Sequence, residues 1–153
     1  MALRTTMALR TTPALRTTLG LFAIIGAAAG MASTGVAAAD PVSIPFQINP
    51  APFGNPNGSF DAPAMRCAAV VGDQPGVVLI TGDKPGGWGC PLSAGVNWIN
   101  LATGATGAAQ LSNGLNGIPA AATLNTGGGQ VALILNPVGG GIVTPGLATF
   151  FVP

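Results

Sequence analysis

The most informative part of this chain reads Cys67-Ala-Ala-Val-Val-Gly-Asp-Gln-Pro-Gly-Val-Val-Leu-Ile-Thr-Gly-Asp-Lys-Pro-Gly-Gly-Trp-Gly-Cys90. It contains both cysteines of the 153-residue chain, the apolar run 77–81 and two turns of one design, 72–76 and 82–86. In each turn, proline presets its φ angle, glycine takes the position that needs a positive φ, and aspartate precedes them as a hydrogen-bond acceptor. The stretch therefore predicts β-strands joined by tight turns, with a cysteine at each end.

A disulfide between Cys67 and Cys90 is the role we expect for the two cysteines. Such a bond persists in an oxidising compartment, and closing a loop of this size contributes roughly 3 kcal/mol in the chain-entropy model. A metal pair and a redox pair are the alternatives. Because the chain has no histidine, the cysteines supply at most half of a zinc site, and their spacing is not the C-x-x-C of a redox motif. We expect a structural disulfide, no metal site and no cofactor.

The N-terminal residues have the pattern of an export signal. Residues 1–18 contain a hexapeptide three times, Met-Ala-Leu-Arg-Thr-Thr, with proline in place of methionine in the third copy. Its arginines give the positive leading segment of a signal peptide. The repetition leaves either Met1 or Met7 as the true start of the protein.

Residues 19–39 form the apolar region of this signal. They carry no charge, are strongly apolar in the first half, and end in small residues. Ala37 and Ala39 fit the A-x-A motif of signal peptidase, which predicts cleavage between Ala39 and Asp40. The alternative is an uncleaved anchor, which would need about 20 apolar residues. We therefore predict a signal peptide over residues 1–39 and a mature protein that is secreted or associated with the cell envelope.

Residues 40–153 are expected to form a single disulfide-stapled β domain. Short apolar runs separated by Gly, Pro and Asn turns, at roughly ten-residue spacing, predict an all-β fold, a small antiparallel sandwich of seven or eight strands. The expected strands are 42–49, 64–71, 77–81, 96–101, 106–112, 121–126, 130–136 and 147–152. Pro45 places the first of them at a sheet edge. We expect residues 121–136 to form a hairpin whose second arm is central and covered on both faces.

The mature segment, from Asp40-Pro41 to Phe151-Val-Pro153 with Met65-Arg-Cys67 and Gly87-Trp-Gly-Cys90, resembles small two-cysteine proteins exported by actinobacteria. Its closing run Pro145-Gly-Leu-Ala-Thr-Phe-Phe-Val152 is similar to the last strands of extracellular immunoglobulin-like domains, although the cysteine spacing differs from that of antibody domains. The resemblance implies a secreted or envelope location, and it brings no activity and no functional residues with it.

The ionisable residues argue against nucleic-acid binding and against catalysis. The mature segment has two cations and four aspartates, a formal charge of 2 − 4 = −2, so it lacks the basic surface that nucleic acid requires.

Serine hydrolysis needs a base for its nucleophile, and there is no histidine. Glycoside hydrolysis needs two facing carboxylates, and substitution of Asp61 and Asp73 would test it. Asp73 and Asp83 are expected at opposite ends of one strand, too far apart to share a calcium ion.

We therefore expect a non-catalytic exported protein that acts as a cell-envelope or extracellular binding or structural module. Its partner would be an envelope protein, glycan or lipid, with no membrane span after cleavage. The candidate contact residues, each also a candidate for the core, are Trp88, Trp98, Phe53 and Phe60. Trp88 is expected to pack over the disulfide, with an exposed contact for a sugar or lipid as the alternative. The alternative function is a pore-forming or self-assembling envelope protein.

Overall fold

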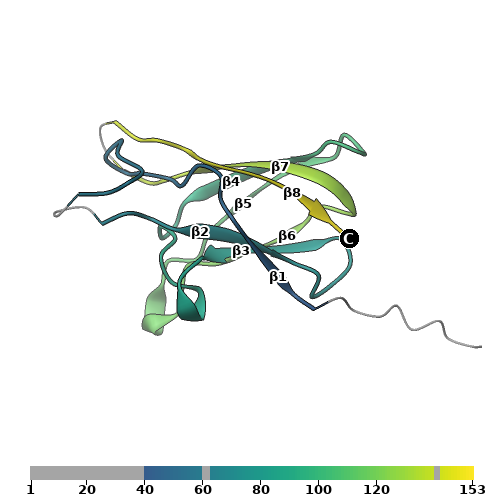
Figure 1. Cartoon of the computed structure of the whole chain (residues 1–153), viewed down its shortest axis with the longest axis horizontal. Helices are drawn as coiled ribbons and strands as arrows, with labels where there is room; N and C mark the ends of the chain where they lie inside the picture. Colours follow the sequence, from purple (N-terminus) through teal and green to yellow (C-terminus); the bar gives the residue numbers. More distant parts are fainter. Residues whose placement is uncertain (1–39, 60–62, 140–141) are drawn as a thin grey trace, which may run out of the picture. The chain divides into compact units, whose positions relative to one another are not determined.

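The computed structural model describes residues 40–59, 63–139 and 142–153 (Figure 1). The strands are β1 (Val42–Pro45), β2 (Cys67–Val71), β3 (Val77–Gly82), β4 (Gly95–Asn100), β5 (Thr106–Gln110), β6 (Ala122–Asn125), β7 (Gly129–Asn136) and β8 (Gly146–Val152). Two short 3-10 turns lie in the connections, η1 (Pro85–Gly87) and η2 (Leu115–Gly117). The predicted all-β antiparallel architecture is confirmed, whereas the predicted signal peptide lies outside the described residues.

The strands form two four-stranded antiparallel sheets. The first sheet has the order β1-β2-β3-β6 and the second the order β5-β4-β7-β8. In Figure 1, β4, β7 and β8 lie above β2, β3 and β6. The core lies between the sheets, because alternate residues of each strand point inward. In β7 these are Val131, Leu133 and Leu135, which meet Val78 and Ile80 of β3 in one buried cluster.

The second sheet has the connectivity of an immunoglobulin-like domain. Two hairpins, β4–β5 and β7–β8, are joined by pairing of β4 with β7, as strands C, C′, F and G are in those domains. In the first sheet β3 lies between β2 and β6, and β1 is an additional edge strand. The disulfide differs from that of antibody domains, since it joins the start of β2 to the loop before β4.

The connection from β6 to β7 crosses from one sheet to the other, so the expected hairpin over residues 121–136 is wrong. β6 pairs with β3, whereas β7 pairs with β4 and β8. β6 and β7 each have one apolar face. Because the two strands lie in opposite sheets, these two faces are buried in the core between the sheets. β7 is central, as expected. It is not covered on both faces, because Ile134 on its outer face is 44% exposed.

Asn100, the last residue of β4, holds this crossing connection in place. Its side chain is fully buried. The Nδ2 group donates hydrogen bonds to the carbonyls of Thr126 (2.9 Å) and Gly128 (3.0 Å). The Oδ1 atom accepts from the N–H groups of Ala102 (2.9 Å) and Thr103 (3.2 Å). A buried amide with both ends satisfied stabilises a single arrangement of the chain.

The first strand leaves its sheet after Pro45. β1 lies at a sheet edge, as this proline predicts, but it ends four residues before the expected end at position 49. The chain then crosses to the second sheet, where the Ile48 N–H donates to the Leu147 carbonyl at 3.1 Å. The Gln47 Oε1 atom accepts from the Thr149 N–H at 2.6 Å. The segment after Pro45 therefore covers the outer edge of β8.

Candidate functional site

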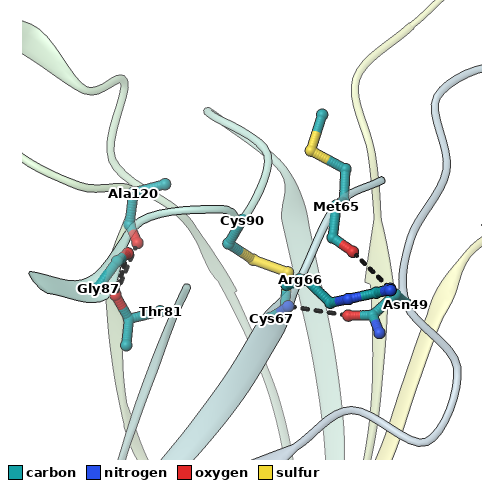
Figure 2. Close-up of a disulfide and its surroundings, with 8 residues drawn as sticks. All are labelled: Asn49, Met65, Arg66, Cys67, Thr81, Gly87, Cys90 and Ala120. Carbon is teal, nitrogen blue, oxygen red and sulfur yellow. Dashed lines mark hydrogen bonds between the residues drawn. A yellow bond between two sulfur atoms is a disulfide. The ribbon is translucent and has the colours of Figure 1, made fainter. Parts of the chain in front are cut away.

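The disulfide between Cys67 and Cys90 is present, as the sequence predicts (Figure 2). The two Cα atoms are 4.7 Å apart, and both side chains belong to the core. The Cys67 N–H donates to Asn49 Oδ1 at 2.9 Å, and the Arg66 N–H donates to the Gly89 carbonyl at 2.7 Å. The Asp83 N–H also donates to the Arg66 carbonyl at 3.1 Å, so one covalent bond and two main-chain hydrogen bonds fix the loop between β3 and β4 to the start of β2.

This loop contains the second of the two predicted turns, which runs from Lys84 to Gly87 rather than over residues 82–86. The Gly87 N–H donates to the Lys84 carbonyl at 2.9 Å, and Gly86 lies between them with φ 76° and ψ 14°. These values are those of the third residue of a type II turn, which glycine adopts without strain. The matching turn at 74–77 has its glycine at φ 70°. The glycine positions predicted for the two turns are therefore confirmed, whereas no hydrogen bond to the side chain of Asp73 or Asp83 is formed among the described residues.

The β3–β4 loop folds back against the end of β3. Thr81 is nine-tenths buried, and its hydroxyl is within hydrogen-bond distance of the carbonyls of Gly87 (3.1 Å) and Ala120 (3.2 Å) (Figure 2). The carbonyl of Trp88 lies so close to Gly82 that a methyl group on that glycine would overlap with it. Only glycine at position 82 allows the loop to approach the strand in this way.

A second loop, between β5 and β6, lies beside the first. The Ser93 N–H donates to the Ser112 carbonyl at 3.1 Å. A Cβ atom on Gly114 would lie 2.6 Å from Leu92 Cδ2, and one on Gly87 would lie 3.5 Å from Pro119 Cβ. Two loops that are separate in sequence therefore form one end of the domain.

Large apolar side chains are exposed on these two loops. We call them the loop-end patch, and they are Trp88 (46% exposed), Leu92 (51%), Leu115 (65%) and Ile118 (59%). Single exposed apolar residues are ordinary on protein surfaces, whereas several together on adjoining loops are typical of a contact surface. The indole of Trp88 adds an N–H donor to an otherwise apolar group.

Within residues 40–153, charge is confined to the N-terminal part. The last charged residue is Lys84, and residues 85–153 contain no Asp, Glu, Lys, Arg or His. Asp83 and Lys84 are both exposed at the start of the first loop, which places one charge of each sign beside the loop-end patch. The patch itself is uncharged.

The structure separates the four candidate contact residues. Trp88 lies in the loop-end patch with 46% of its surface exposed, and its indole lies beside Gly86, whereas its packing over the disulfide stays a prediction. Trp98 packs against the core, with its indole over Gly107 of β5. Phe53 is 73% exposed and lines a pocket of about 220 Å³ in the connection between β1 and β2. Phe60 lies outside the described residues.

Among the described residues, the carboxylates do not converge. Asp73 follows β2 and Asp83 follows β3, so the antiparallel pairing places them at opposite ends of the first sheet, as expected. Asp61 lies outside the described residues. Within residues 40–59, 63–139 and 142–153, no group of three Cys or Asp side chains is arranged to hold a metal ion.

Three of the four patch residues, and also Asn100, were not predicted from the sequence. Leu92, Leu115 and Ile118 are isolated apolar residues within segments rich in Gly, Asn, Ser and Pro. An aliphatic residue inside a predicted turn is itself a signal of exposure, since a tight turn has little apolar surface to bury it against. Asn100 has no comparable signal, because asparagine at a strand end is common at the surface.

Comparisons of this chain with protein-family models, with characterised proteins and with solved structures find no match. Among the described residues, no helix has the length and the apolar character that crossing a membrane would require. The candidate site therefore rests on the geometry of the loop end alone.

Proposed function

We propose that this protein is an exported, non-catalytic module that binds an apolar or amphipathic component of the cell envelope through the loop-end patch. The observation that carries the proposal is the exposure of Trp88, Leu92, Leu115 and Ile118 on two adjoining loops. The predicted signal peptide, the disulfide and the resemblance to exported actinobacterial proteins support it.

The composition of the patch favours a lipid surface over a glycan. Sugar recognition requires polar groups placed to hydrogen-bond hydroxyls beside the aromatic ring, whereas here the ring is accompanied by three aliphatic side chains. Tryptophan with aliphatic residues is typical of segments that lie at a lipid interface, where the indole N–H stays among the polar headgroups. Lys84 beside the patch adds one cation for an anionic headgroup.

Contacts within the domain fix the β3–β4 and β5–β6 loops, so the side chains of the loop-end patch stay exposed while the sandwich keeps its structure. The first loop is fixed by the disulfide and by Thr81, and the second by its contact with Leu92 and by the Ser93–Ser112 hydrogen bond. Because the patch is held in place before binding, contact with a partner requires little ordering of the chain.

Vesicle binding of the exported form tests this proposal. The variant Trp98→Phe leaves Trp88 as the only tryptophan, since the chain has two. We expect a blue shift of its emission and co-sedimentation with phosphatidylcholine vesicles containing anionic lipid. Replacing Leu115 and Ile118 by serine should reduce sedimentation at least about tenfold, because each buried aliphatic side chain contributes roughly 1.5–3 kcal/mol.

Phe151→Ser is the matched control. Phe151 is also exposed, but it lies near the opposite end of the sandwich, where the Gly76 N–H donates to the Pro153 carbonyl at 3.0 Å. This variant should sediment with vesicles as the wild type does. Absence of binding to every vesicle composition, together with binding to isolated cell-wall polysaccharide, would show that the component is a glycan. Loss of binding in Phe151→Ser alone would overturn the assignment of the patch.

A further inference from the structure

The edge of the second sheet at β5 presents unpaired main-chain groups. At the two ends of its pairing with β4, the Asn100 N–H donates to the Ala105 carbonyl at 2.8 Å, and the Leu111 N–H donates to the Ala94 carbonyl at 2.9 Å. In an antiparallel ladder, residues that bond to one neighbour alternate with residues that face the other way. Positions 105, 107, 109 and 111 therefore bond to β4. The N–H and C=O groups of Thr106, Ala108 and Gln110 face outward.

The other sheet edges have protective features that β5 lacks. The segment from Gln47 to Ala51 covers β8, through hydrogen bonds to Thr149, Leu147 and Thr144. β1 contains a proline, and β6 has only four residues. Natural edge strands avoid pairing through charge, proline, short length or a covering segment. β5 has no charge and no proline, and within the described part of the chain nothing bonds to its outward main-chain groups.

We propose that β5 pairs with β5 of a second copy of this chain, antiparallel about a two-fold axis, so that the two second sheets become one continuous sheet. The outward main-chain groups belong to Thr106, Ala108 and Gln110, so the middle residue, Ala108, lies at the centre of the pairing. Ala108 then faces Ala108 of the partner subunit, and Thr106 faces Gln110 of the partner subunit. Each facing pair exchanges both of its main-chain hydrogen bonds, since these residues occupy hydrogen-bonded positions of the ladder.

The absence of charge favours a second copy as the occupant. A two-fold axis brings each side chain near the axis close to its own copy, so any charge there would meet a like charge. Residues 85–153 contain no charged side chain. The residues nearest the axis are small, Gly107, Ala108 and Ala109, so two strands meet without steric conflict. On the outer face, the Thr106 hydroxyl would lie opposite the amide of Gln110 of the partner subunit.

The partly exposed Trp98 gives a second reason for pairing at this edge. Its indole extends from β4 across Gly107, where a Cβ atom would lie 2.7 Å from the ring carbon Cε2. The ring packs against the core but remains only partly buried, because the sheet ends at β5. A second β5 strand would cover this side of the ring and bury apolar surface in addition to forming hydrogen bonds.

Sedimentation equilibrium of the exported form with its disulfide intact tests the proposal. The wild type should show a monomer–dimer equilibrium over micromolar concentrations. Ala108→Pro removes an N–H that faces outward, so the ladder to β4 is retained while both central hydrogen bonds of the dimer are lost. We expect dimerisation at least about tenfold weaker, with thermal unfolding close to that of the wild type. Ala108→Ser retains the N–H and should dimerise as the wild type does.

Cysteine cross-linking tests the register. Hydrogen-bonded antiparallel pairs have Cα atoms about 5.5 Å apart, which a disulfide can span. Ala108→Cys should therefore form a covalent dimer on oxidation. Asn97→Cys should not, because Asn97 pairs with Ala108 from β4 and lies one strand farther from the axis. A wild type that is monomeric at all concentrations, or an Ala108→Pro variant that dimerises as tightly, would overturn the proposal. Neither result depends on envelope binding.

Discussion

The side-chain amide of Asn100 and the carbonyl of Thr126 are joined by a buried hydrogen bond of 2.9 Å that connects the end of β4 to the start of the β6–β7 crossing. The Oδ1 atom of the same side chain accepts hydrogen bonds from the N–H groups of Ala102 and Thr103, in the turn that follows β4. One residue thus fixes both a hairpin in the second sheet and the connection that brings the chain into that sheet. Because this crossing decides which sheet β7 enters, Asn100 is central to the topology.

Asn100→Ala should lower the free energy of unfolding by about 3 kcal/mol. The substitution leaves carbonyls of the crossing and N–H groups of the turn without partners in a buried site, and each unsatisfied group costs about 1–3 kcal/mol. Urea unfolding followed by circular dichroism would measure the change. Asn97→Ala is the control, because Asn97 is exposed on the outer face of the same strand, and its effect should stay within about 0.5 kcal/mol. Equal effects of the two variants would contradict this role.

Gly82→Ala should displace the β3–β4 loop. A methyl group at this position overlaps with the main chain of Trp88, so either the loop or the strand must move. We expect a loss of about 2 kcal/mol, in the range for overpacking, and a change in Trp88 fluorescence. Gly95→Ala is the matched control in β4, since a methyl group there meets nothing within 4 Å. A Gly82→Ala variant as stable as Gly95→Ala would show that the loop does not lie against β3.

Replacing Cys67 and Cys90 by alanine should lower the free energy of unfolding by about 3 kcal/mol. The disulfide closes a loop with a sequence separation of 23, and the chain-entropy model gives a contribution of this size. Denaturant unfolding with and without a reducing agent would measure it. Reduction should weaken the wild type and leave the double variant unchanged. Stability of the wild type that is insensitive to complete reduction would refute this prediction.

Gln47→Ala should loosen the outer edge of β8. Gln47 accepts from the Thr149 N–H at 2.6 Å, and removal of this acceptor costs about 1 kcal/mol. Hydrogen exchange of the Thr149 amide should become roughly fivefold faster. Gln130→Ala replaces another exposed amide side chain of the second sheet and should leave that exchange rate unchanged. An unaltered rate in Gln47→Ala would mean that the side chain does not protect the edge.

Local chemistry predicted much of the fold, and long-range packing decided the remainder. The X-Pro-Gly-X turns could be predicted because proline and glycine act within four residues. The disulfide could be predicted because the chain has only two cysteines. The sheet to which β6 and β7 belong could not, because a glycine-rich connection fits both a hairpin and a crossing. The difference lies in the hydrogen bonds that Asn100 donates to carbonyls 26 and 28 residues further along the chain.

The candidate site could be predicted only in part for the same reason. Trp88 was recognisable as a large aromatic residue within a glycine-rich segment. Its association with Leu115 and Ile118 depends on the second loop lying beside the first, which local sequence does not specify. Trp98 was an equally good candidate by residue type, but its position opposite Gly107 turns the ring toward the core.

Intact mass of the protein recovered from fractionated producing cells tests most directly whether this chain acts outside the cytosol as a disulfide-stapled binding module. We expect recovery from the envelope or the medium, a chain that begins at Asp40, and a mass two hydrogen atoms below that of the reduced sequence. A cytosolic protein that retains residues 1–39 and has both thiols free would contradict this expectation.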